Sequence, residues 1–108
     1  TDDMLIVRGV NLYPSQIESI LMDAEGTLPH YLLVLTRAGA LDDLEIRVEV
    51  TPEIFSDEVK VLENLRSTIQ MRVKSLLGLS SKVSLVEPGS IERSVGKAKR
   101  VLDLREEE

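Results

Sequence analysis

Apolar and polar residues follow a pattern whose period changes several times along the chain. Residues 4–7 form a short apolar run typical of a strand, and residues 31–36 are nearly all apolar, as in a strand buried on both faces. Over residues 44–50 apolar side chains alternate with charged ones. This period of two predicts a strand with one buried and one solvated face. Residues 82–86 predict a last strand, which ends before a Pro-Gly pair.

Two segments between these strands have a helical period. The first begins with a capping box over residues 15–18, or one position earlier at Pro14, and ends near Gly26. The second opens with acidic residues after position 56, and its apolar residues recur at steps of three and four. Gly78 stands where a left-handed helix cap is expected.

The order strand, helix, strand, strand, helix, strand predicts an α+β fold, a ferredoxin-like βαββαβ sandwich. We expect an open antiparallel sheet with both helices on one face, in which the two central strands form a hairpin with a rather long loop. This core occupies residues 4–87. Residues 1–3 precede it, and residues 88–108 form a polar C-terminal extension. One domain therefore accounts for the chain.

Composition narrows the function classes. The 108 residues are 43% apolar and 30% charged, which is typical of a globular domain. There is no cysteine and a single histidine, His30, so a disulfide framework and the usual zinc cluster are excluded and no metal site is predicted. A net charge of −6 argues against nucleic-acid binding, and no apolar run approaches a membrane span. Without a signal-peptide pattern we expect a cytoplasmic location, and the initial Thr1 suggests an excised piece.

Two segments near the ends carry more specific information. Residues 1–18 contain, in order, an Asp-Asp pair, an apolar strand, an Arg-Gly loop and a Pro-x-x-Ile-Glu helix start. Residues 91–103 contain Gly-Lys-Ala-x-Arg-Val followed by Asp. Together they resemble the hinge region and the final Gly-Lys motif of acyl-adenylate-forming enzymes. The resemblance covers the whole chain and is nearest to the C-terminal lid domain of phenylacetate–CoA ligases.

The resemblance implies a division of labour between two domains. A large N-terminal domain of the same polypeptide would hold ATP, Mg²⁺ and an aromatic carboxylic acid, and the lid would complete the adenylation and thioesterification sites in turn. Asp2 matches the hinge, Lys97 matches the catalytic lysine of adenylation, and Arg8 with Gly9 matches the loop that serves thioester formation with CoA. We expect the 108 residues alone to be inactive and to bind no cofactor tightly.

Other readings stay open at this point. A βαββαβ unit is also typical of ACT-like regulatory domains that bind small molecules at dimer interfaces, and the domain could be a structural or homodimerisation module. Lys97 could be a solvated surface charge, and Arg8-Gly9 could be only a tight turn. For the segment around Gly96 and Lys97 we predict high mobility without the large domain.

Overall fold

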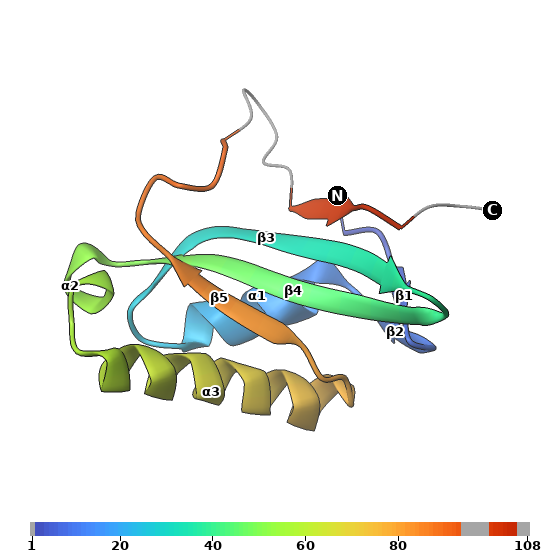
Figure 1. Cartoon of the computed structure of the whole chain (residues 1–108), viewed down its shortest axis with the longest axis horizontal. Coiled ribbons are helices and arrows are strands. Elements are labelled where there is room, and N and C mark those ends of the chain that lie inside the picture. The colour runs from blue at the N-terminus through green and yellow to red at the C-terminus, as the bar shows by residue number, and fades with distance from the viewer. Residues whose placement is uncertain (1, 94–99, 106–108) are drawn as a thin grey trace.

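A four-stranded sheet forms the centre of the computed structural model, which describes residues 2–93 and 100–105. The strand order is β5-β4-β3-β6 (Figure 1). The strands are β3 (Thr27–Ala38), β4 (Leu41–Val50), β5 (Lys82–Val86) and β6 (Val101–Asp103). β3 and β4 are antiparallel, whereas β5 is parallel to β4 and β6 is parallel to β3. The sheet is therefore mixed, and the prediction of an antiparallel sheet was wrong.

The first predicted strand lies outside this sheet. β1 (Leu5–Val7) pairs instead with β2 (Val10–Leu12) as a separate antiparallel hairpin. The ferredoxin-like strand order is consequently not found among the described residues, because that order requires the first strand inside the main sheet. The physical reason is local: a two-residue turn closes the β1–β2 ladder at little entropic cost, so β1 finds its hydrogen-bond partner next to itself in sequence.

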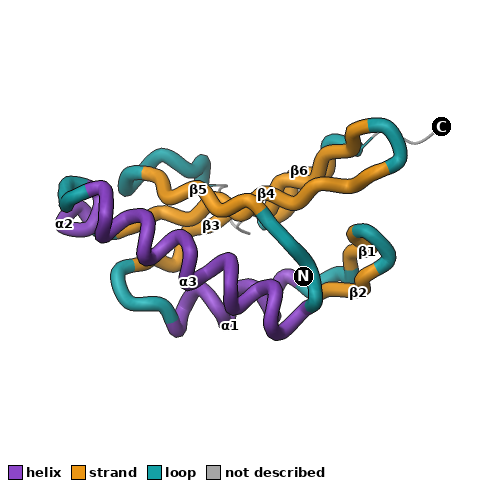
Figure 2. Tube along the Cα trace, turned by 60° about the horizontal axis from the view of Figure 1, so that its bottom comes forward, coloured by secondary structure: helices purple, strands orange, loops and turns teal. Residues whose placement is uncertain are grey.

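The sequence predicted the two main helices well and their starts less well. α1 (Pro14–Asp23) and α3 (Val59–Leu77) lie on the same side of the sheet, as expected (Figure 2). A third, short helix, α2 (Pro52–Phe55), was not predicted. Gly78 is left-handed with φ 72° and caps α3, as the sequence indicated. None of the described helices has the length and apolar character needed to cross a membrane.

The core lies between the sheet and these helices. The predicted buried face of β4 is confirmed, because Leu44, Ile46, Val48 and Val50 are all buried. Across the hairpin, Ile46 pairs with Leu33 of β3, which is also buried. The β3–β4 connection is shorter than expected, since Ala38 pairs with Leu41 and leaves only the residues Gly39 and Ala40 between the strands.

Candidate functional site

The Arg8-Gly9 turn joins β1 to β2 and has an unusual backbone. Because Val7 pairs with Val10, the loop between the two strands consists of Arg8 and Gly9 alone. Their φ angles are 50° and 75°, and positive angles at both central positions are the mark of a type I′ hairpin turn. A Cβ placed on Gly9 would find no other atom within 4 Å. The space above this glycine is therefore open, and a ligand can approach the backbone there.

Beneath the turn lies a group of charged side chains that we name the Asp42 cluster. It comprises Arg8, Arg37, Asp42, Asp43, Asp103 and Arg105. The Asp42 carboxylate accepts hydrogen bonds from Arg37 Nε at 2.8 Å, Arg105 Nη1 at 3.1 Å and the Arg8 amide at 3.2 Å. Asp42 thus joins the start of β4 to the turn and to the last described residue of the chain.

Arg105 connects this cluster to β1 directly. Its Nη1 donates to the Ile6 carbonyl oxygen at 2.7 Å, and its Nε donates to Asp103 Oδ1 at 3.0 Å. The side chains of Arg105 and Asp42 are each only 13% exposed. The hydrogen bond from Arg37, with that from the Arg8 amide, lowers the pKa of Asp42. A carboxylate held in its ionised form among arginines is a structural anchor rather than a proton acceptor.

Asp2, the predicted hinge residue, is bound to the start of α1. Its carboxylate accepts a hydrogen bond from the Ser15 amide at 2.8 Å and one from Ser15 Oγ at 2.6 Å. These two bonds lower the pKa of Asp2. The expected capping box was misassigned: the Tyr13 amide donates to Gln16 Oε1 at 2.8 Å, and Ser15 is a donor to Asp2 rather than the cap.

Lys97 lies outside the described residues, and so does the segment for which mobility was predicted. The residues on its N-terminal side are anchored by Glu49. This carboxylate accepts from the amides of Gly89 and Ile91 at 2.9 and 3.0 Å, and from Arg93 Nη2 at 2.7 Å. Glu49 was expected on a solvated face but is 0% exposed, because the segment that follows β5 covers it.

The C-terminal side of the same segment is anchored by Tyr31. The guanidinium carbon of Arg100 lies 4.5 Å from the centroid of the Tyr31 ring, a cation–π contact. The Arg100 carbonyl oxygen also accepts from the Leu33 amide at 2.8 Å, at the start of the β6–β3 pairing. The Tyr31 hydroxyl donates to Glu18 Oε1 of α1 at 2.8 Å. The side chains of Arg93 and Arg100 therefore both contact residues of the main sheet, Glu49 in β4 and Tyr31 in β3.

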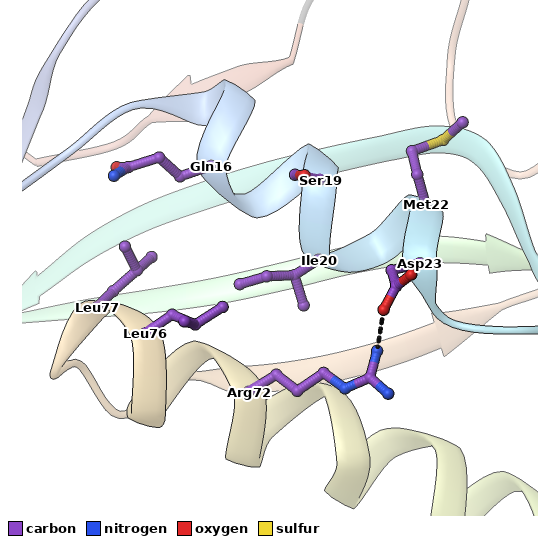
Figure 3. Close-up of a pocket in the computed structure, with 8 residues that line it drawn as sticks. All are labelled: Gln16, Ser19, Ile20, Met22, Asp23, Arg72, Leu76 and Leu77. Atoms are coloured by element: carbon purple, nitrogen blue, oxygen red, sulfur yellow. Dashed lines mark hydrogen bonds and ion pairs between the residues drawn. The ribbon is translucent and has the colours of Figure 1, made fainter.

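A separate hollow lies between α1 and α3 (Figure 3). It measures about 620 Å³ and has an apolar floor that includes Ile20 and Leu77. At one end the Asp23 carboxylate pairs with Arg72 Nη1 at 3.0 Å. Asp2, Arg8 and Gly9, for which the sequence predicted a functional role, do not line this groove. Within residues 2–93 and 100–105, no three histidine, cysteine or acidic side chains are grouped so that they could hold a metal ion.

The structure thus brings Arg8 and Gly9 together with residues that sequence analysis missed. Asp42 contacts the turn from a distant part of the chain, and Arg105 contacts β1 and Asp42. Glu49 looked like any other charged residue of an alternating strand. The signal that could have drawn attention to Asp42 is the pair Asp42-Asp43 directly after the hairpin turn. No local pattern marks Glu49.

Comparison with known proteins places these features in a family. The family described as AMP-binding enzyme C-terminal domain matches residues 9–105. The phenylacetate-coenzyme A ligase of Thermus thermophilus is 44% identical over 97% of this chain. The chain spans only 26% of that relative's length.

Two solved structures are similar in fold. A domain of phenylacetate-coenzyme A ligase from Bacteroides vulgatus has 35% identity and a TM-score of 0.88, covering 97% of this chain and 95% of that one. A 2-hydroxyisobutyryl-CoA ligase, solved with 2-HIB-AMP and CoA in the thioesterification state, has 41% identity and a TM-score of 0.87. The match covers 97% of this chain and 22% of that ligase. From the family match and these identities, the chain belongs to the AMP-binding enzyme C-terminal domains, and within them it is similar to the C-terminal region of phenylacetate-CoA ligases.

Proposed function

We propose that this chain is the mobile C-terminal domain of an AMP-forming ligase that joins an aryl or arylacetic acid to CoA. In the first step the carboxylate attacks the α-phosphate of ATP and pyrophosphate leaves. In the second step the CoA thiol attacks the acyl-adenylate carbonyl and AMP leaves. A large N-terminal domain would hold ATP, the acid and Mg²⁺, which neutralises phosphate charge when bound. The isolated chain would have no activity.

The observation that carries this function is the family match over residues 9–105, and the geometry of the Arg8-Gly9 turn is compatible with it. The open space above Gly9 fits the passage of an extended, narrow group such as the pantetheine arm of CoA along the backbone. The relative solved with an acyl-adenylate and CoA in the thioesterification state has the same fold over 97% of this chain. In this proposal the turn faces the acyl-adenylate during the second step, with Arg8 near a phosphate or the carboxyl group.

Lys97 is proposed to act in the first step. Its ammonium would lie against the charge that develops between the attacking carboxylate and the α-phosphate. Loss of one such contact reduces a rate by about 10²–10³-fold.

Asp2 is proposed as the pivot between the two positions. Because its side chain is bound to Ser15, a rotation in the backbone on the N-terminal side of Asp2 would carry the carboxylate, α1 and the rest of the domain together. Such a hinge concentrates the torsional change in one or two residues while the elements beside it stay rigid.

The test uses the complete ligase and measures the two steps separately. Lys97→Ala is expected to lower phenylacetate-dependent ATP–pyrophosphate exchange by about 10²–10³-fold and to spare thioester formation from supplied phenylacetyl-adenylate. Gly9→Val is expected to spare exchange and to lower thioester formation, because its side chain would enter the open space above the turn and a β-branched residue disfavours the φ of 75° at this position. Adenylation near the wild-type rate in the Lys97 variant would refute the role of this lysine.

A further inference from the structure

Arg8 has a backbone conformation that its side chain disfavours. Its φ of 50° is the only left-handed value at a non-glycine residue in the part of the chain that the structure describes. For an L-residue with a long side chain this region is strained, because Cβ approaches the following carbonyl oxygen. Residues in such conformations persist only where their surroundings hold them, and they cluster at functional sites.

Asp42 provides much of what holds Arg8 in place. Its Oδ2 accepts from the Arg8 amide at 3.2 Å, and its carbonyl oxygen accepts from Arg8 Nε at 2.5 Å. The neighbouring carboxylate of Asp43 accepts from Arg8 Nη2 at 2.9 Å. Backbone and side chain of Arg8 are therefore fixed by the same short segment at the start of β4.

Asp42 is itself fixed from the other side. Arg37 and Arg105 donate to its two carboxylate oxygens, and Arg105 also donates to the Ile6 carbonyl oxygen in β1. The hairpin, β4 and the C-terminal strand thus meet at one carboxylate that is largely shielded from water. This is more support than a tight turn requires, since a type I′ turn with Asn-Gly or Gly-Gly closes without any of these contacts.

We propose that Asp42 is a positioning residue for thioester formation, which holds the Arg8-Gly9 turn in the conformation that admits CoA. The proposal rests on the proposed function of that turn. Asp42 touches neither substrate and acts through Arg8. Its loss lets the strained turn relax toward an ordinary backbone, which displaces both Arg8 and the open space above Gly9.

The experiment uses Asp42→Asn in the complete ligase, with phenylacetate, ATP and CoA. Misplacement of a positioning group costs a rate up to about 10²-fold, so thioester formation from supplied phenylacetyl-adenylate is expected to fall about ten- to hundred-fold. Phenylacetate-dependent ATP–pyrophosphate exchange is expected to stay within about two-fold of wild type. The matched control is Asp23→Asn, which removes the carboxylate paired with Arg72 in the groove and is expected to change neither step.

A general loss of structure would lower the rates of both steps, whereas the loss of a positioning residue for thioester formation lowers only the second. Equal losses in both steps, or a thioester rate within about two-fold of wild type, would overturn the proposal. In an Arg8→Gly background, Asp42→Asn is expected to cause little further loss, because glycine adopts the left-handed conformation of residue 8 without support from Asp42. If Asp42→Asn does not fold, Asp43→Ala replaces it. The Asp43 side chain is 54% exposed and its loss removes only the acceptor of Arg8 Nη2, so the thioester rate is expected to fall and the exchange rate to stay.

The thioester rate of Gly9→Val distinguishes a failure of the role proposed for Asp42 from a failure of the function proposed for the turn. A thioester defect in Gly9→Val, with a normal Asp42→Asn variant, would refute the positioning role alone. A normal thioester rate in Gly9→Val would refute the function proposed for the turn, and the role of Asp42 with it.

Discussion

The buried carboxylate of Glu49 lies 2.7 Å from Nη2 of Arg93, a residue that follows it by 44 positions. The two residues join the C-terminal end of the central strand β4 to the segment that follows β5. Glu49 is 0% exposed, whereas the Arg93 side chain is 43% exposed. A buried carboxylate is tolerated only when it is paired and hydrogen-bonded, and here a guanidinium and two backbone amides satisfy it.

Removal of this carboxylate should destabilise the domain markedly. Glu49→Ala leaves the amides of Gly89 and Ile91 and the Arg93 guanidinium without their acceptor. We expect the free energy of unfolding to fall by about 3 kcal/mol. This is the lower end of the range for a broken buried ion pair, because the half-exposed Arg93 side chain can be hydrated by water. Urea denaturation of the 108-residue chain measures it. Glu63→Ala, which breaks the exposed Glu63–Arg66 pair, is the control and should leave stability unchanged.

The same carboxylate should make stability depend on acid. Burial raises the pKa of Glu49, but hydrogen bonds from Arg93, Gly89 and Ile91 outweigh it, so the pKa lies below its ordinary value of 4.5. A depressed pKa contributes stability above the unfolded-state value, and this contribution is lost as the pH falls through the folded-state value. Wild type should therefore lose more stability than Glu49→Gln between about pH 7 and about pH 3 in urea titrations. If the free energy of unfolding depended on pH in the same way in wild type and in Glu49→Gln, the lowered pKa of Glu49 would be contradicted.

Tyr31 should contribute through its hydroxyl and its ring separately. Burial, helped by the bond to Glu18, raises the pKa of Tyr31, so its hydroxyl remains a donor over the ordinary pH range. Tyr31→Phe loses the bond to Glu18 and should cost about 1 kcal/mol of unfolding free energy. Tyr31→Leu also loses the Arg100 contact and the packing of a buried ring, so it should cost at least about 0.5–1 kcal/mol more than Tyr31→Phe. Thermal and urea unfolding would reveal the order, and equal losses would argue against the cation–π contact.

The contact between Asp2 and Ser15 should protect the start of α1. Ser15→Ala removes the 2.6 Å bond from Oγ to the Asp2 carboxylate. Hydrogen exchange of the amides in the first turn should become about five-fold faster, as after the loss of a helix cap. Ser19→Ala, four positions later on the same helix, is the matched control and should leave these amides unchanged. Unaltered exchange in Ser15→Ala would mean that the bond from Oγ does not protect the helix start.

Much of the local structure was determined by the sequence alone. The positions of α1, α3, β4 and β5 follow from short-range periodicity and from end signals such as Gly78, because each helix or strand must turn its apolar side chains toward one core. The two end motifs also indicated the family, since they stand in order at opposite ends of one domain.

Tertiary structure decided which strands pair and which charges are covered. Nothing in residues 5–7 tells whether they join β2 or the main sheet, and nothing at Glu49 tells that residues 89–93 will cover it. The Asp42 cluster likewise joins residues as far apart as Ile6 and Arg105, 99 positions from each other. Periodicity reports only which face of an element is apolar. The partner of a polar group is selected by the whole chain, because a buried charge needs donors that only distant segments supply.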